Sequence, residues 1–226
     1  MVHKANLGAH MTKSNLCINR RNQSSCHFLI LAIVLLTGSC INVDQEVILS
    51  SDGSGSMKVV ITAEQAFYES EDFGTTGYEI ADALEEITYL EGFKLVNDRE
   101  YSSEGMHIWE SNYTFKDILK LGNDDFIVTF EPSGDIMVLK MEATLVRENN
   151  PGFTKEELAT EEVQTFLQQM ADYHFKLQVT VPGPVKDAPR AKVAGRTAAW
   201  EIPLDRVFNP KRKTMRMRVV YQDESK

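Results

Sequence analysis

The stretch VDQEVILSSDGSGSMKVVI, residues 43–61, decides the fold of this chain. Residues 43–49 alternate in part between apolar and polar side chains, and residues 57–61 form a second strand-like run. The loop DGSG at 52–55 contains Asp-Gly, which is a strong turn signal, and its length is typical of a hairpin loop. It is acidic and contains glycine, but it lacks the full ligand spacing of a calcium-binding loop. The stretch therefore predicts a β-hairpin.

The pattern downstream of the hairpin indicates the fold class. Alternation and turn residues predict further strands over 93–101, 106–115, 126–130, 136–146, 175–181, 191–202 and 215–221. Helical spacing predicts helices over 78–91, over 116–122 and from Thr154 onward. Strands in runs, punctuated by a few helices, are typical of an α+β domain. We expect a mostly antiparallel β-sheet with two or three packed helices, and Trp200 facing inward.

The helix expected from Thr154 has the clearest start signal. Thr154 and Glu157 form a capping box, and Phe153 and Leu158 occupy the two positions of a hydrophobic staple. Thr160 is a second capping candidate, so a break in the helix at that residue is the alternative.

Residues 1–39 differ in charge from the rest of the chain. They hold four basic residues and no acidic one, followed by the nine-residue apolar run FLILAIVLL at 28–36. A basic region, a short apolar core and small residues are the three parts of a secretory signal. A transmembrane helix needs about 20 apolar residues, so this run is too short to span a membrane. The leader predicts export, with Met11 as an alternative start that gives a more usual signal length.

The end of the leader, TGSC at 37–40, resembles a lipobox, the motif in which an acylated cysteine becomes the mature N-terminus. Gly38 and Ser39 fit this motif, whereas Thr37 stands where leucine is preferred; an ordinary secretory signal is the alternative. We expect a cleaved lipoprotein signal peptide over 1–39. The remainder, 40–226, is then a single α+β envelope domain.

Cysteine usage agrees with this interpretation. Cys17 and Cys26 lie in the leader, so a mature chain has Cys40 as its only thiol and no internal disulfide. Two or more acyl chains, such as palmitate, hold a protein on a membrane stably. Cys40 is therefore the expected lipidation site, and the membrane is the expected partner through its acyl chains.

The charge of the mature chain excludes one class of partner. Removing the leader lowers the basic residues from 24 to 20 against 33 acidic ones, which gives a net charge of −13. Nucleic-acid binding needs concentrated positive charge, so we expect no nucleic-acid partner.

Three segments together resemble a known family. Residues 43–60 resemble the strand, turn and strand that follow the lipid cysteine in a group of bacterial lipoproteins. Residues 179–185 (VTVPGPV) and 195–204 (GRTAAWEIPL) resemble the closing segment of the LppM-like lipoprotein domain. This resemblance implies a β-rich envelope domain for which lipid or glycolipid binding has been suggested. The resemblance implies no catalytic residues for this chain.

Motifs for chemistry are scarce. The mature chain has two histidines, His107 and His174, without the spacing of a zinc site, so we expect no metal and no cofactor. Nucleophile-elbow, P-loop and dinucleotide-binding motifs are missing from the sequence. Paired acids at 85–86, 124–125 and 156–157 are expected to be solvated faces or caps, although catalysis by carboxylates that converge in space is not visible in a sequence.

One basic cluster stands against the acidic background. It consists of Lys211, Arg212, Lys213, Arg216 and Arg218. Near a bilayer each basic residue contributes about 1 kcal/mol of attraction to anionic lipid, so these residues are candidates for headgroup contact. The alternative is a charged loop next to an edge strand that charges protect from aggregation.

These observations favour a membrane-anchored, non-enzymatic lipoprotein of the cell envelope that binds lipid or a partner protein. The alternatives are an envelope hydrolase using convergent carboxylates and a structural subunit of an envelope assembly. The expected location is extracytoplasmic. Because Ile41 rather than aspartate follows Cys40, the outer membrane is expected in a cell with two membranes.

Overall fold

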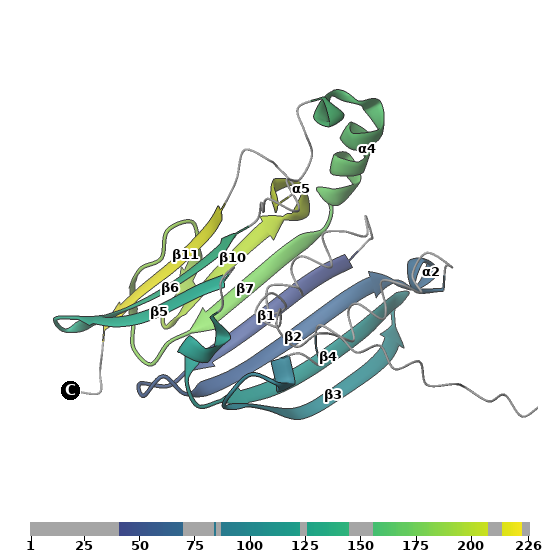
Figure 1. The fold of residues 1–226 in the computed structure, drawn as a ribbon. Helices are drawn as coiled ribbons and strands as arrows, with labels where there is room; N and C mark the ends of the chain where they lie inside the picture. Colours follow the sequence, from purple (N-terminus) through teal and green to yellow (C-terminus); the bar gives the residue numbers. More distant parts are fainter. Residues whose placement is uncertain are drawn as a thin grey trace, which may run out of the picture.

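The computed structural model describes residues 41–69, 84, 87–122, 126–144, 156–207 and 214–222, which are mostly β-strand (Figure 1). The named elements in chain order are β1 (Ile41–Leu49), β2 (Gly55–Glu64), α2 (Gln65–Tyr68), β3 (Phe93–Ser103), β4 (Met106–Phe115), η2 (Ile118–Leu121), β5 (Phe126–Ser133), β6 (Ile136–Thr144), η3 (Glu157–Ala159), α4 (Glu161–Met170), β7 (His174–Thr180), β8 (Val185–Asp187), β9 (Lys192–Ala194), β10 (Thr197–Pro203), α5 (Leu204–Val207) and β11 (Thr214–Gln222).

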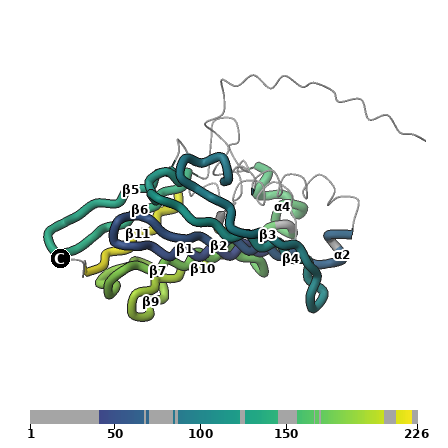
Figure 2. The backbone as a smooth tube through the Cα atoms, turned by 90° about the horizontal axis from the view of Figure 1, so that it is seen from below, coloured from purple at the N-terminus to yellow at the C-terminus, as the bar shows by residue number. Residues whose placement is uncertain are grey.

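The strands form two sheets. The larger has the order β3-β4-β2-β1-β7-β10-β9, and the smaller has the order β5-β6-β11-β8. The smaller sheet lies against one face of the larger one (Figures 1 and 2), and buried residues of both belong to one hydrophobic core. The expected α+β domain is thus mostly β-sheet, with two sheets rather than one and with short helices.

The predicted first hairpin is confirmed, and it starts earlier than expected. β1 and β2 pair antiparallel from Ile41↔Ala63 to Leu49↔Gly55. In the turn, the Asp52 carboxylate accepts hydrogen bonds from the backbone N–H (3.0 Å) and the hydroxyl (2.6 Å) of Ser54. These bonds hold down the pKa of Asp52. The loop is therefore a self-bonded turn, as the Asp-Gly signal predicts.

A parallel pair lies at the centre of the larger sheet. β1 runs parallel to β7, from Val43↔Phe175 to Ile48↔Thr180, while the other ladders are antiparallel. With strands on both sides, β1 places Ile41, Val43 and Val47 in the core, each at most 2% exposed. Alternate residues of β1 face outward, as the period of two along a strand requires.

The remaining predicted strands are confirmed with small shifts at their ends. β3–β4, β5–β6 and β9–β10 are antiparallel hairpins, and β7 and β11 match the two alternating runs near the C-terminus. Trp200 on β10 is 3% exposed, so it faces inward as expected.

The helices differ more from the expectation. Leu84, Ile87 and Thr88 are helical, and the rest of the predicted 78–91 helix up to residue 86 lies outside the described residues. The 116–122 segment is a 3₁₀ turn, capped by Asp117, whose carboxylate accepts from the Leu119 N–H. The helix expected from Thr154, a residue that is not described, gives way to η3 and then α4.

The break at Thr160 is the alternative that the sequence offered. The Thr160 hydroxyl accepts from the Val163 N–H at 3.4 Å and donates to the carbonyl of Glu157 at 2.7 Å. Its backbone is extended, with ψ of 145°, which ends η3 before α4 begins. None of the described helices is long and apolar enough to cross a membrane.

Candidate functional site

The end of the larger sheet next to Cys40 is the first candidate surface, and we call it the N-terminal edge. It comprises the start of β1 at Ile41, the end of β2 at Glu64, the start of β7 at His174 and the end of β10 at Pro203. The N–H of His174 donates to the Asn42 side chain at 2.9 Å, which ties β7 to β1 at this end. Cys40 itself lies outside the described residues.

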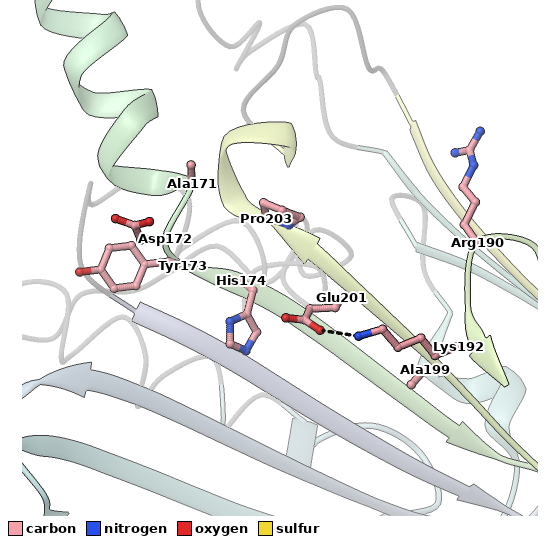
Figure 3. Close-up of a pocket in the computed structure, with 9 residues that line it drawn as sticks. All are labelled: Ala171, Asp172, Tyr173, His174, Arg190, Lys192, Ala199, Glu201 and Pro203. Atoms are coloured by element: carbon pink, nitrogen blue, oxygen red, sulfur yellow. Dashed lines mark ion pairs between the residues drawn. The ribbon is translucent and has the colours of Figure 1, made fainter. Parts of the chain in front are cut away.

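A cavity of about 280 Å³ opens at this edge, and we call it the edge cavity (Figure 3). Figure 3 shows His174 and Glu201 side by side on neighbouring strands, with Lys192 beyond Glu201. Lys192 and Glu201 form an ion pair at 3.6 Å, and His174 Nε2 lies 3.7 Å from Asp44 Oδ1. The other lining residues are Ala171, Asp172, Tyr173, Arg190, Ala199 and Pro203.

A larger cavity of about 480 Å³ lies on the smaller sheet, and we call it the basic groove. Its charged lining residues are Lys140, Glu142, Arg190, Arg216 and Arg218, of which four are cations. The remaining lining residues are Met141, Pro189, Thr214 and Met217. A net positive lining stands out in a chain whose overall net charge is −9.

The structure brings two of the predicted headgroup residues, Arg216 and Arg218, into this groove. Arg216 donates two hydrogen bonds to Glu142, at 2.8 and 3.0 Å, and Arg218 pairs with Asp187. The Arg216 bond holds down the pKa of Glu142, and that carboxylate raises the pKa of Arg216. Both guanidinium groups therefore already have anionic partners. Lys211, Arg212 and Lys213 lie outside the described residues.

β11 lies between β6 and β8 in the order of the smaller sheet. It pairs with β6 along its whole length and with β8 at Val220 and Tyr221. Arg216 and Arg218 lie on the part of β11 that precedes its pairing with β8, so the alternative of an edge strand protected by charges stays a prediction.

Lys140 and Arg190 are groove residues that the sequence did not reveal. Lys140 is brought beside β11 by the pairing of β6, where it lies opposite Arg218. Arg190 sits in the turn between β8 and β9 and lines both the basic groove and the edge cavity. Neither position carries a local signal beyond the turn-forming Pro189.

The second histidine belongs to a packed cluster near the start of β4. His107 is 5% exposed and stacks on Tyr68 with ring centroids 3.5 Å apart. Its Nε2 lies 2.8 Å from Glu100 Oε1, and its Nδ1 lies 3.2 Å from the Ser102 hydroxyl. Burial, and then the charge of Glu100, raise the pKa of Tyr68. These contacts fasten α2 to the β3–β4 hairpin, which gives the cluster a packing role.

Comparison with known proteins adds a likeness to solved structures. No family model and no curated protein matches the sequence. The chain is similar to the folded domain of the LppM protein of Mycobacterium tuberculosis, whose structure was determined by NMR. Sequence identity is 14%, the match covers 83% of this chain and 93% of that one, and the TM-score is 0.45. The resemblance to an LppM-like domain expected from the sequence is confirmed as a likeness of fold alone.

The hydrolase alternative stays a prediction, and the acid pairs at 85–86 and 124–125 lie outside the described residues. Convergent catalytic acids require at least one carboxyl group whose pKa is raised. Where the described carboxylates are shifted, in Asp52, Glu91, Glu110 and Glu142, the pKa is lowered. No group of three or more potential metal ligands gathers among the described residues.

Glu110 on β4 has two cationic partners and one amide partner. Its side chain is 9% exposed and contacts Arg99 Nη2 at 2.8 Å and Lys58 Nζ at 3.2 Å, while Asn112 donates at 3.3 Å. The Arg99 hydrogen bond is the first cause of the lowered pKa of Glu110.

This network predicts a pH-dependent effect of the substitution Glu110→Gln. A lowered folded-state pKa stabilises the fold above the unfolded value of about 4.3, and this contribution is lost as the pH falls through the folded pKa. Because Arg99 and Lys58 are largely exposed, we expect a loss of about 1 kcal/mol at pH 7. Urea unfolding at pH 7 and pH 3 should show the difference from wild type shrinking at the lower pH. A difference that is equal at both pH values would contradict this account.

Proposed function

We propose that this protein is a lipid-anchored lipoprotein of the bacterial cell envelope that acts as a non-enzymatic binding module at the membrane surface. The observation that supports this most directly is the position of Ile41. It is fully buried and is the first residue of β1, a central strand of the larger sheet. The residue expected to carry the acyl chains therefore directly precedes the core of the domain.

The short connection between Cys40 and β1 supports an orientation in which the N-terminal edge faces the bilayer. One extended residue spans about 3.5 Å, so an acylated Cys40 holds the N-terminal edge within a few ångströms of the headgroups. The edge cavity opens at this same end. α5 follows β10 at this end as well (Figure 1). A ligand in the edge cavity would therefore lie at the level of the lipid headgroups.

Binding of an anionic lipid or envelope component is the activity that this arrangement favours. The basic groove gathers four cations in an acidic protein, and complementary charge raises the local concentration of an anionic partner. A purely structural subunit would not require such a lining. The proposal thus combines an anchor at Cys40 with two cavities that share Arg190, of which the edge cavity lies at the N-terminal edge.

The anchor is tested by membrane fractionation of the full-length precursor expressed in bacteria. The substitution Cys40→Ala should lower the membrane-bound fraction by about tenfold or more, because removal of two or more acyl chains removes the hydrophobic anchor. Intact mass spectrometry of the wild-type protein should show a chain that starts at residue 40 and carries fatty acids.

The leader cysteines provide the matched control. Replacing Cys17 and Cys26 with alanine should change neither the membrane fraction nor the mature mass, because both residues are removed with the signal peptide. Membrane association that survives Cys40→Ala, together with a wild-type mass without acyl chains, would refute the proposal.

A further inference from the structure

Arg190 has a backbone conformation that is unusual for its residue type. Its φ is +64°, in the left-handed region that glycine and asparagine favour. It follows Pro189 in a turn closed by a hydrogen bond of 3.1 Å from the Ala191 N–H to the Ala188 carbonyl. Glycine at this position would relieve the conformation at no steric cost. An arginine held there indicates that its side chain is used.

A hydrogen bond connects the turn at Pro189 and Arg190 to a buried side chain of the core. The indole N–H of Trp200 donates to the Pro189 carbonyl at 2.9 Å, and Trp200 is 3% exposed. The peptide that precedes Arg190 is thus bonded to one of the largest buried side chains of β10. This bond restrains the backbone from which the Arg190 side chain extends.

The guanidinium group of Arg190 also differs from the other groove cations in its partners. Arg216 and Arg218 each pair with a carboxylate, and Lys140 Nζ lies 3.8 Å from Glu131. Among the described residues, no carboxylate pairs with Arg190. Its five N–H donors are therefore available to a ligand, whereas the three neighbouring cations are each balanced by a carboxylate.

We propose that Arg190 anchors the phosphate group of a ligand in the basic groove. A guanidinium group matches two phosphate oxygens with two parallel hydrogen bonds, and the fixed turn reduces the entropy lost on binding. The groove has room for a phosphate and the glycerol or sugar attached to it. This deepens the proposed function, since the membrane supplies phosphate esters at the level of the N-terminal edge. Free phosphate shares the same chemistry.

The test uses the full-length protein, purified from membranes in a neutral detergent. Calorimetric titration with inorganic phosphate, with a short-chain phosphatidylglycerol and with the matching short-chain diacylglycerol compares the two sources of phosphate with a neutral lipid. We expect the phosphate-bearing lipid to bind and the diacylglycerol to bind at least about tenfold more weakly. Equal affinity for inorganic phosphate identifies a free phosphate site, and preference for the lipid identifies a headgroup site.

The substitution Arg190→Gly separates binding from folding. It should weaken phosphate binding by about tenfold or more while the melting temperature stays at or above that of wild type, because glycine suits the backbone. Arg190→Lys should fall between the two, since it keeps the charge and loses the paired donors.

Glu104 supplies the matched control, because it is a non-glycine residue with φ of +52° in the β3–β4 turn. Glu104→Gly should change stability in the same direction and leave binding unaltered. Wild-type binding in Arg190→Gly, or no binding of either phosphate probe by the wild-type protein, overturns the assignment. The fractionation of Cys40→Ala is independent of this result, so a failed anchor and a failed phosphate site are distinguished.

Discussion

Replacing Gly55 with alanine is expected to lower the melting temperature of the protein by about 10 °C. A Cβ atom at this position would lie 2.0 Å from the backbone carbonyl oxygen of Ile48 and 2.8 Å from Cζ of Phe115. The Cζ atom is the far end of a side chain that can rotate, whereas the carbonyl oxygen belongs to β1 and moves only if the strand moves. Gly55 pairs with Leu49 on one side and with Phe115 on the other, so both ladders are disturbed.

Gly53 in the same loop is the control for this effect. Its φ is +84°, but the nearest atoms to an added Cβ belong to the Phe130 ring, at 3.8 Å. Gly53→Ala therefore meets backbone strain without overlap and should cost about 1 kcal/mol, or about 2–4 °C. Circular dichroism melts of the two variants under identical conditions give the comparison. Equal melting temperatures would show that β1 yields more easily than its central position implies.

The hairpins could be predicted because their determinants are local. Alternation sets which residues face the core, and turns such as the one at Asp52 join neighbouring strands in the sequence. The parallel pairing of β1 with β7 could not be predicted in this way. Val43 and Phe175 are adjacent in the sheet and 132 positions apart in the chain. The sequence of neither strand specifies which other strand it pairs with. The division into two sheets follows from the same kind of long-range contact.

The candidate site likewise has features that depend on local sequence and features that depend on long-range contacts. Along β11 the exposed Arg216 and Arg218 alternate with the buried Met217 and Val219, which is the period of two that a strand requires. The carboxylate partners of the two arginines depend on the register of β6 and on the docking of β8, which strand periodicity does not specify. Arg190 was missed because its role comes from one backbone torsion angle and one hydrogen bond from a distant indole. The only local sequence signal at this position is Pro189, which is typical of a turn.

Replacing Trp200 with alanine should destabilise the protein by about 3–5 kcal/mol, the range found for buried aromatic residues. The indole is 3% exposed and lies in the core beside Leu177, its partner on β7. The loss combines the transfer free energy of the ring with the cavity that it leaves. Urea unfolding measures the change. A cost below about 1 kcal/mol would mean that the ring contributes little to the core.

The more informative variant is Trp200→Phe, which keeps an aromatic ring in the core and removes the donor to the Pro189 carbonyl. The loss of that hydrogen bond and the smaller ring should together cost about 1–2 kcal/mol. Phosphate binding should weaken as well, because the turn that presents Arg190 is then held less firmly. Trp109→Phe is the control, since Trp109 packs against Tyr68 and His107 on another strand. If both variants bind phosphate equally well, the bond from Trp200 has no part in positioning Arg190.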